Sequence, residues 1–244
     1  MYKCFNNISY FDYLDSSNDY LIGLYKKFHI ISPLTIYVDN QKKGRGSMGK
    51  NWFAGKPGLT FSFSVKMLQN HQPFTFNILT TLSILRLLRN LDIQAYIKYP
   101  NDIIVKSKKI AGVLTDIINV QGHKYAVVGV GLNVNHLTFN QSIPCATSLC
   151  QLLSKQMNKE ELFKSLIMNI KDLMKLYVNQ KHDIKTLYLQ NLQGANDYVL
   201  AFFRGKKVFL KILHLNSQGV LTLQERDSLV VYTVASTEVQ FLLT

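Results

Sequence analysis

The chain has 244 residues, 47% of them hydrophobic, which is enough for one sizeable core and a small second unit. Its 28 Lys and Arg against 15 Asp and Glu give a formal net charge of +13, which favours an anionic partner such as a nucleic acid, a nucleotide or an acidic protein. The lysines are scattered, so a generally basic surface explains the charge equally well. No apolar run approaches the roughly 18 residues of a membrane span and no signal peptide is recognisable, so we expect a cytoplasmic protein without membrane contact.

Cysteine and histidine usage argues against a structural metal site. Cys4, Cys145 and Cys150 are odd in number and lack C-x-x-C spacing, so we expect free thiols and neither a disulfide framework nor a zinc site. The six His residues are dispersed and form no H-E-x-x-H pair, which argues against a metal held by imidazoles.

A short hydrophobic opening leads to the first predicted helix. Residues 15–18, DSSN, form an N-cap cluster, and the apolar residues that follow at helical spacing are Leu21, Leu24, Tyr25 and Phe28. Serine hydroxyls in such a cluster often do no more than cap the helix. A helix N-terminus also offers free N–H donors, so binding of a polar ligand group is the alternative.

Segment 41–64, QKKGRGSMGKNWFAGKPGLTFSFS, is a glycine-rich basic loop between two predicted strands, 34–38 and 59–65. The second strand alternates apolar and polar residues, as a half-buried strand does. We expect positive φ at Gly44, Gly46 and Gly49, so that consecutive N–H groups surround an anion. Positive charge around this loop comes from Lys42, Lys43, Arg45 and Lys50. An ordinary flexible basic loop is the alternative.

Segment 98–114, KYPNDIIVKSKKIAGVL, follows a helix predicted over 74–91. A strand ends at Tyr99, a turn follows, and 103–105 with 110–114 forms a hairpin. Lys109 stands where the chain enters an apolar strand beside Gly112, and a lysine in such a place often binds an anion. Asn101 and Asp102 are also explained by the turn alone.

Segment 125–135, YAVVGVGLNVN, is an apolar strand that carries Gly129 and Gly131. It is not a dinucleotide-binding fingerprint, because Val134 replaces the third glycine of G-x-G-x-x-G and no long helix follows at once. The glycine-rich loop is not a Walker A motif either, because Pro57 stands where Ser or Thr is required.

The clearest predicted helix covers 158–177, with Asn158 and Glu161 as a capping box. Near residue 193 the pattern changes to short alternating strands divided by turn residues, about four or five of them, which is typical of a small SH3-like β-barrel. We therefore expect two domains, residues 1–193 and residues 194–244.

Four stretches, taken in this order, resemble the biotin protein ligase family: DSSN at 15–18, GRGSMGKNW at 44–52, KYPND with KIAGVL at 98–114, and GVGLNVN at 129–135. The resemblance extends over the whole chain. It implies an α+β fold with a central mixed β-sheet and helices, of the class II synthetase-like type of biotin and lipoate ligases, plus the C-terminal SH3-like barrel.

The resemblance also implies an ATP-dependent ligase. Such an enzyme joins biotin to ATP as biotinyl-5′-AMP, releases pyrophosphate, and passes the biotinyl group to a lysine of a biotin carboxyl carrier protein domain, such as that of acetyl-CoA carboxylase. Two anions must meet in this reaction, so fixed cations and N–H donors matter more than a covalent nucleophile.

The site residues that the resemblance implies fall into overlapping sets. Biotin would be bound by Ser16, Ser17, Gln41, Gly44, Arg45, Lys109 and Gly112. ATP and the adenylate would be bound by Gly44, Arg45, Gly46, Lys50, Trp52, Asn101, Lys109 and Asn133. The catalytic residues would be Lys109, Arg45 and Asp102.

Individual roles follow from the same resemblance. Lys109 would bind the biotin carboxylate and the α-phosphate, and Asn101 and Asn133 would read the adenine. Asp102 would either help to hold the Mg²⁺ that accompanies ATP or orient the incoming lysine. Trp52 would form an aromatic wall over the adenylate, with a buried structural Trp as the alternative.

The chain departs from the family pattern in the glycine-rich loop. Ser47 replaces the second Arg of G-R-G-R, and Lys50 replaces the Arg before x-W. Ser47 brings no charge, so retention of the phosphate would rely on Arg45 and Lys50, with Lys42 or Lys43. The first helix motif begins at Asp15, which leaves no room for the DNA-binding winged helix of some members, so we expect no DNA partner.

Two other functions compete with this interpretation. Lipoate and octanoate transferases share the catalytic fold and a comparable lysine but lack the G-R-G-x-x-G-x-x-W loop. A nucleic-acid-binding module would use aromatic and basic residues of the barrel, which are Phe202, Phe203, Arg204, Lys206 and Lys207. The sequence does not decide between a monomer and a homodimer.

Overall fold

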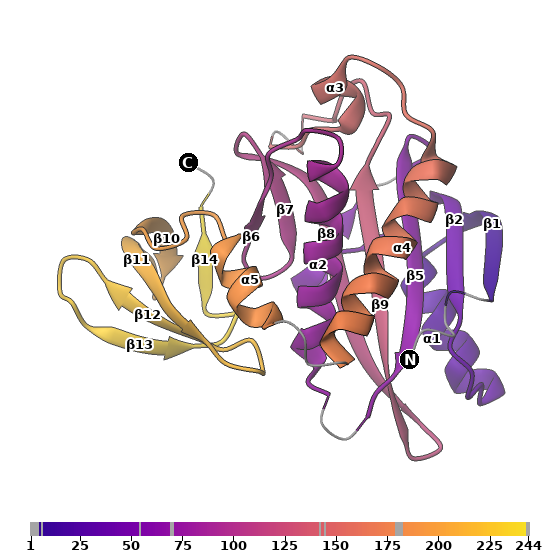
Figure 1. Cartoon of the computed structure of the whole chain (residues 1–244), viewed down its shortest axis with the longest axis horizontal. Helices are drawn as coiled ribbons and strands as arrows, with labels where there is room; N and C mark the ends of the chain where they lie inside the picture. Colours follow the sequence, from indigo (N-terminus) through magenta and orange to yellow (C-terminus); the bar gives the residue numbers. More distant parts are fainter. Residues whose placement is uncertain are drawn as a thin grey trace.

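The computed structural model describes residues 5, 7–53, 55–68, 71–141, 143, 145–178 and 183–242. Seven strands form a mixed sheet in the order β1-β2-β5-β9-β8-β7-β6 (Figure 1). They are β1 (Ile8–Leu14), β2 (Thr35–Gln41), β5 (Gly58–Lys66), β6 (Tyr96–Lys98), β7 (Asp102–Val105), β8 (Lys108–Val120) and β9 (His123–Asn133). β1 and β2 run parallel, and the other neighbours run antiparallel. This is the expected α+β class.

Helices cover both faces of this sheet. α2 (Pro73–Arg89) and α4 (Lys159–Val178) lie side by side on one face, and α1 (Ser17–Phe28) packs on the other (Figure 1). Two short helices, α3 (Leu149–Leu153) and α5 (Ile184–Gln190), complete this part of the chain. The sheet therefore separates a large core beneath α2 and α4 from a smaller one beneath α1.

β5 shows how the sheet divides core from cavity. Successive side chains of a strand point to opposite faces. Phe61 and Phe63 enter the large core, whereas Thr60 and Ser62 face a cavity on the α1 side. The sequence predicted a half-buried strand, but residues 58–65 are all buried. The polar face is covered because α1 and the segment after β2 lie over it.

β9 and β8 continue the same division. On β9, Val128 and Val130 lie in the large core, while Gly129 and Gly131 face the cavity. Gly112 of β8 lines the cavity as well. Because β5, β9 and β8 are neighbours in the sheet, small and polar residues of three strands share one surface.

The glycine-rich loop is a small hairpin rather than a flexible segment. β3 (Gly44–Arg45) pairs with β4 (Asn51–Trp52), and a 3₁₀ turn over Ser47–Gly49 joins them. The expectation of positive φ holds for Gly49, at 70°, but not for Gly44 or Gly46. Gly46 has extended backbone with φ −103°. A Cβ on Gly44 would lie 2.3 Å from Nε2 of Gln41, so that glycine is needed for close approach instead.

The C-terminal segment forms an antiparallel five-stranded sheet in the order β13-β12-β11-β10-β14, consistent with the expected SH3-like barrel. Its strands are β10 (Val199–Phe203), β11 (Lys206–Leu215), β12 (Leu221–Glu225), β13 (Val231–Val234) and β14 (Val239–Phe241). Phe203 is buried, and Arg204 stacks on it and on Tyr232. Of the two aromatics that the nucleic-acid interpretation uses, only Phe202 is exposed, which weakens that interpretation.

Three features differ from the sequence analysis. The opening segment forms β1, an edge strand that was not predicted. β8 does not end near Leu114 but continues to Val120 and turns into β9 at Gln121 and Gly122, which both have positive φ. Phe28 was expected on the buried side of α1, but it is 59% exposed because this apolar stripe runs past the end of the packed surface at Tyr25.

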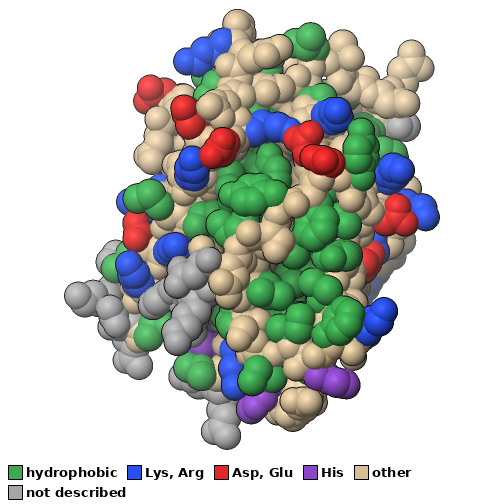
Figure 2. Space-filling model, turned by 90° about the vertical axis from the view of Figure 1, so that its right-hand side faces the viewer, with side chains coloured by type: hydrophobic (Ala, Val, Ile, Leu, Met, Phe, Trp, Pro, Cys, Tyr) green, Lys and Arg blue, Asp and Glu red, His purple; other side chains and the backbone are tan. Residues whose placement is uncertain are grey.

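The β1 edge of the molecule is rich in exposed hydrophobic side chains. Figure 2 shows hydrophobic side chains gathered across the middle of the face on this side. Those exposed on β1, on α1 and just after it are Tyr10, Tyr13, Tyr20, Phe28 and Ile31.

Membrane-spanning helices, cysteine pairing and metal-binding groups can be described only for the part of the chain that the structure describes. Within it, no helix has both the length and the apolar character needed to cross a membrane. Cys145 is exposed and Cys150 is buried, and both are free, while Cys4 lies outside the described residues. No three His, Cys, Asp or Glu side chains in that part are grouped so as to hold a metal ion.

α4 packs on the sheet through aromatic contacts of Phe163 in the large core. Phe163 lies edge-on to Phe61 and to Tyr37, with ring centroids 5.0 and 5.1 Å apart. As predicted, Asn158 caps this helix, since its Oδ1 accepts the N–H groups of Glu160 and Glu161 at 3.0 and 3.3 Å.

We predict that Phe163→Ala lowers the free energy of unfolding by about 3–5 kcal/mol, because it leaves a cavity among these rings. Denaturant titration followed by circular dichroism measures this. Met168 lies on the same helix and is 64% exposed, so Met168→Ala serves as the control and should change stability by less than about 0.5 kcal/mol. Equal losses in the two variants would contradict this packing.

Candidate active site

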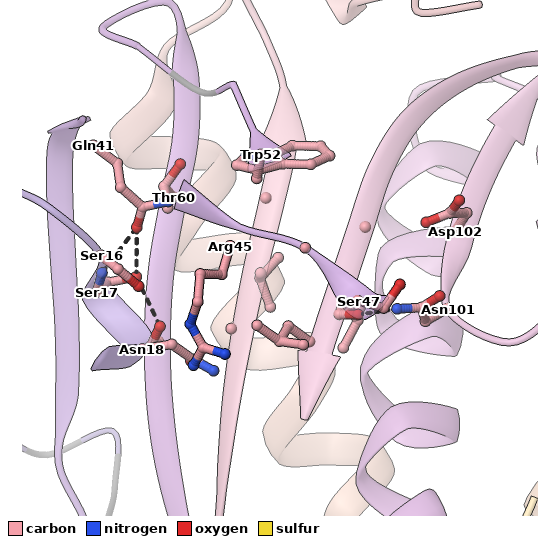
Figure 3. A pocket seen from close by; sticks show the side chains of 18 of the residues that line it. Ser16, Ser17, Asn18, Gln41, Arg45, Ser47, Trp52, Thr60, Asn101 and Asp102 are labelled. Atoms are coloured by element: carbon pink, nitrogen blue, oxygen red, sulfur yellow. Dashed lines mark hydrogen bonds between the residues drawn. The ribbon is translucent and has the colours of Figure 1, made fainter. Parts of the chain in front are cut away.

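A cavity of about 440 Å³ lies between the N-terminus of α1, the central strands and the β3–β4 hairpin; we call it the inner cavity (Figure 3). In Figure 3, Ser16, Ser17, Asn18 and Gln41 gather on one side and Asn101 with Asp102 lies on the other. The walls are therefore supplied by segments far apart in the sequence.

Hydroxyl and amide groups form a hydrogen-bond network where the N-terminus of α1 meets β2 and β5 beside the inner cavity. Oε1 of Gln41 accepts the backbone N–H of Ser17 at 2.8 Å and its hydroxyl at 3.1 Å. The Ser17 hydroxyl also lies 2.7 Å from that of Ser62. Ser16 caps α1 through a bond from the Asp19 N–H at 3.2 Å. The DSSN motif therefore caps the helix and also lines a cavity, and its binding of a polar ligand group stays a prediction.

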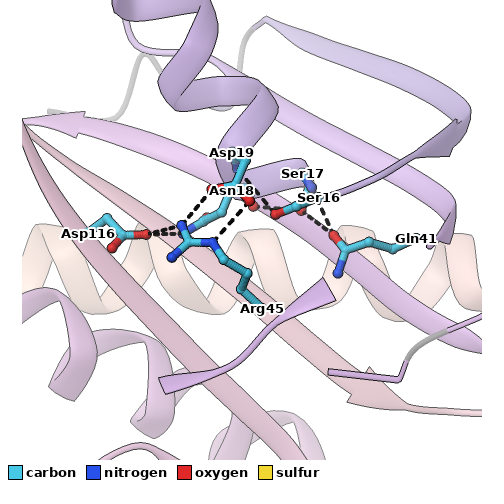
Figure 4. Close-up of polar contacts among 8 residues, drawn as sticks. Ser16, Ser17, Asn18, Asp19, Gln41, Arg45 and Asp116 are labelled. Carbon is cyan, nitrogen blue, oxygen red and sulfur yellow. Dashed lines mark hydrogen bonds and ion pairs between the residues drawn. The ribbon is translucent and has the colours of Figure 1, made fainter. Parts of the chain in front are cut away.

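Arg45 crosses from the hairpin to α1 and β8 (Figure 4). Its guanidinium lies 2.7 Å from Asp19 and 3.0 Å from Asp116. Burial alone would lower the pKa of Arg45, but hydrogen bonds to Asp19 and Asp116 and their charges raise it overall. Arg45 thus holds the hairpin across the inner cavity, a structural contact that the sequence did not predict.

Lys109 lies at the end of the inner cavity beside a carboxylate and an indole. Its Nζ is 2.6 Å from Oδ1 of Asp102 and 5.3 Å from the centre of the Trp52 ring. A Cβ on Gly112 would lie 3.3 Å from that Nζ, so a glycine leaves the ammonium its room. Lys109 on β8 and Asp102 on the neighbouring strand β7, which the family resemblance assigned to one site, lie side by side, and their ion pair is a contact that the sequence did not predict.

Trp52 rests on the backbone of β9. A Cβ on Gly131 would lie 2.2 Å from the indole, which no side chain allows, so Gly131 is needed for the ring to lie there. The ring is half-buried, and it lines the inner cavity and a second one. Trp52 is therefore a wall of the site and also packs against the sheet.

A larger cavity of about 900 Å³, which we call the outer cavity, adjoins the first and shares Trp52, Asp102 and Lys109 with it. Lys50, Lys98 and Asn133 also line it. Two separate ligand groups can therefore meet at Lys109. Asp102 is the one acidic side chain that lines either cavity, counting described residues only.

Lys98 belongs to this cation group although the sequence analysis gave it no role. Burial lowers the pKa of Lys98, Asp102 opposes the shift, and the charges of Lys109 and Lys50 add to it. Lys98 therefore lies close enough to Lys109 and Lys50 to be affected by their charges, and a group of three cations favours a bound polyanion. The position of Lys98 at the strand end before P-N-D was the available signal.

Asn101 and Asn133 lie on different sides of the site. Nδ2 of Asn101 donates to the carbonyl of Val113 at 2.5 Å beside the inner cavity. Nδ2 of Asn133 donates to the carbonyls of Thr147 at 3.0 Å and Lys109 at 3.4 Å beside the outer cavity. Both side-chain amides therefore hold backbone carbonyls in place beside the two cavities.

The other expected loop cations are divided. Lys50 lines the outer cavity. Lys43 pairs with Asp15 at 3.0 Å, and Lys42 lies over the Tyr13 ring, so both are directed away from the two cavities. Gly44 and Gly46 shape the hairpin.

Polar and small residues on the cavity face of the strands, such as Thr60 and Gly129, were not predicted as site residues. The alternation of apolar and polar residues does not tell which face of a strand borders a cavity.

Comparisons with known proteins identify the family of this chain. A profile of the biotin/lipoate A/B protein ligase family matches residues 10–133. The bifunctional ligase/repressor BirA of Bacillus spizizenii is 24% identical over 203 residues, which cover 80% of this chain and 62% of BirA. The chain thus spans roughly three fifths of the length of that relative.

Two solved structures share the fold. Biotin protein ligase from Aquifex aeolicus in complex with biotin and ATP aligns with a TM-score of 0.80 at 22% identity, over 98% of this chain and 99% of that chain. The enzyme from Leishmania major in complex with biotinyl-5-AMP aligns with a TM-score of 0.62 at 18% identity, over 94% and 98%. Because the profile match covers half of the chain, the protein belongs to the biotin/lipoate A/B protein ligase family.

Proposed function

We propose that this protein is a biotin protein ligase, which activates biotin with ATP and transfers it to a lysine of a biotin carboxyl carrier protein domain. The observation that carries this proposal is the place of Lys109, half-buried at the junction of two cavities and paired with Asp102. The relatives and structural neighbours named as biotin ligases support it.

The first step would be an in-line displacement at phosphorus. A carboxylate oxygen of biotin attacks the α-phosphorus of ATP, the bond from that phosphorus to the β-phosphate oxygen breaks, and pyrophosphate leaves. Lys109, at the junction, would neutralise both the carboxylate and the α-phosphate, which otherwise repel each other. Its partner Asp102 would keep the ammonium in place before the two anions arrive.

The polar inner cavity favours biotin over lipoate. Hydroxyl and amide groups of Ser16, Ser17, Gln41 and Ser62 meet there, together with the backbone near Arg45. A cyclic urea offers donors and an acceptor to such groups, whereas an alkyl chain or a dithiolane would leave them unpaired. Lipoate or octanoate ligation remains the second candidate, since the family includes both.

The outer cavity suits the nucleotide. Trp52 offers a ring for stacking, Asn133 an amide oxygen, and Lys50 and Lys98 positive charge. Asp102 supplies only one carboxylate, which is too few protein ligands to bind Mg²⁺ without a nucleotide. One carboxylate is enough for a Mg²⁺ that is also bound by the triphosphate of ATP. The metal would neutralise phosphate charge when bound.

In the second step the ε-amine of the carrier lysine attacks the acyl carbon of biotinyl-5′-AMP and AMP leaves. The mixed anhydride must be kept from water until then, which the β3–β4 hairpin would do because Arg45 holds it over the inner cavity. The proposal includes a biotin carboxyl carrier protein as the acceptor. It includes a ligase that acts either as a monomer or as a homodimer.

We predict biotin-dependent exchange of pyrophosphate into ATP, measured with labelled pyrophosphate. Lys109→Ala should reduce the exchange rate by roughly 10²–10³, the usual cost of removing one preorganised donor to a transition state. Lys108 is the exposed neighbour on β8 and lines neither cavity, so Lys108→Ala is the matched control and should keep full activity.

Lipoate and octanoate are tested in parallel. Exchange with either acid and none with biotin would move the protein to the lipoate branch of its family. The absence of exchange with all three acids would overturn the proposed activity. Tight, salt-sensitive RNA binding with no exchange would instead support the nucleic-acid-binding interpretation.

We predict that Ser47→Arg slows release of the adenylate. Ser47 lines the inner cavity without charge, and a guanidinium there would add an ion pair worth about 0.2–1 kcal/mol, which corresponds to up to about fivefold. Release is followed by rapid filtration of pre-formed complex. Ser9→Arg, on the exposed β1, controls for added charge. An unchanged release rate would count against this role of the loop.

A further inference from the structure

Lys159, the first residue of α4, carries an ammonium that the helix itself does not favour. The helix dipole disfavours positive charge at a helix N-terminus, and the next two residues, Glu160 and Glu161, follow the usual acidic preference. The side chain of Lys159 is only 19% exposed, whereas that of Lys164 on the same helix is 67% exposed. Taking an ammonium out of water costs free energy unless partners compensate, so its burial points to contacts with other segments.

Two acceptors from different segments surround this ammonium. Nζ of Lys159 donates to Oδ1 of Asp39 on β2 at 2.5 Å and to the backbone carbonyl of Lys56 at 2.6 Å. Asp39 comes before the β3–β4 hairpin in the chain, and Lys56 comes after it. One charged side chain from α4 thus joins the segments that lead into and out of the hairpin. We call this the hairpin-base contact.

The stretch between Asp39 and Lys56 supplies much of the site, although Lys159 itself lines neither cavity. Its residues that line the inner or the outer cavity are Gln41, Arg45, Gly46, Ser47, Lys50, Asn51, Trp52 and Phe53. Holding the two ends of a loop together removes part of the entropy that the loop loses when it is ordered. A contact at the base therefore acts on all of these residues without touching a ligand.

Two sets of contacts hold the hairpin, and they differ in exposure. Arg45 within the hairpin pairs with Asp19 and Asp116, and its side chain is 42% exposed. Lys159 is less than half as exposed. Water and salt screen an exposed ion pair more strongly than a buried one, so the hairpin-base contact is the more persistent of the two. We expect the hairpin to open at Arg45 while its base stays in place.

We propose that Lys159 is a positioning residue of the site: through the hairpin-base contact it keeps the β3–β4 hairpin over the two cavities and so retains a bound acyl-adenylate. The retention of the adenylate deepens the proposed function and rests on it. The effect on the hairpin does not, because the contact is present without a ligand.

Quenching of Trp52 fluorescence by acrylamide tests the hairpin-base contact without any ligand, because Trp52 is the only Trp of the chain and lies on β4. Lys159→Met removes the ammonium and keeps a long side chain. It should raise the quenching constant about twofold, since a loosened hairpin exposes the indole more often. Lys159→Arg keeps charge and donors and should restore most of the protection. Lys164→Met, the same change at an exposed ion pair of α4, is the matched control and should leave quenching and adenylate release unchanged.

Release of the pre-formed adenylate complex, followed by rapid filtration, measures the functional consequence. Lys159→Met should release the adenylate about tenfold faster, as expected for the loss of a hydrogen bond to a charged group. The KM for ATP should rise by a larger factor than kcat falls, because Lys50 and Trp52 lie on the hairpin side whereas Lys109 and Asp102 lie on β8 and β7. A mere loss of folded protein would lower kcat and leave the KM as it is.

The carboxylate partner provides a second variant. Asp39→Ala leaves the ammonium with the Lys56 carbonyl alone and should speed adenylate release about threefold. Because both changes break one contact, the double variant Lys159→Met/Asp39→Ala should release the adenylate no faster than Lys159→Met. Effects that multiply in the double variant would show two separate actions and would overturn the positioning role.

The outcomes separate this inference from the proposed function. If the wild type forms no adenylate but Trp52 is quenched more readily in Lys159→Met than in Lys164→Met, the hairpin-base contact is supported and the proposed function is overturned. If the wild type forms the adenylate and Lys159→Met equals it in quenching and release, the inference alone is overturned. If Lys159→Met fails to fold, Asp39→Ala decides: faster release supports the inference, and release at the wild-type rate overturns it.

Discussion

The close pair of Lys109 and Asp102 is the interaction on which the rest of the site depends. The half-buried ammonium of Lys109 is held in place because a carboxylate oxygen of Asp102 lies 2.6 Å from it. Gly112 leaves room for it, Trp52 covers it, and the Asn133 amide bonds to the backbone carbonyl of Lys109. The sheet thus presents one fixed cation where two cavities meet, and two anions that would repel each other can be held side by side.

The sheet performs this task by using its two faces differently. Beneath α2 and α4, the strands bury large side chains such as Phe61 and Val130 and supply the stability of the domain. On the opposite face, Gly129 and Gly131 of β9 allow Asn18 and Trp52 to approach the backbone closely. The hairpin then closes this surface, held by the ion pairs of Arg45 to α1 and β8. The hydrophobic core and the wall of the cavity are therefore formed by alternate residues of the same strands.

Much of this was predictable from the sequence, and the exceptions have physical reasons. The long helices and the β7–β8 hairpin follow from periodicity and turn residues, whereas the presence of Lys109 and Asp102 in one site was expected only from the family resemblance. The pairing of Arg45 with Asp19 and Asp116 was not predicted, because it joins three segments whose proximity only the folded sheet creates. The glycines were assigned to positive φ when most of those at the site instead provide space, which depends on which side chain lies opposite.

The central claim, that the two cavities join a carboxylate to a nucleotide at Lys109, is tested most directly by a single-turnover reaction with biotin and ATP labelled at the α-phosphate, without an acceptor protein. The account predicts that label accumulates as biotinyl-5′-AMP, approaching one equivalent per protein chain and remaining bound to it. Label found only in unreacted ATP, or in free AMP formed equally without biotin, would contradict it.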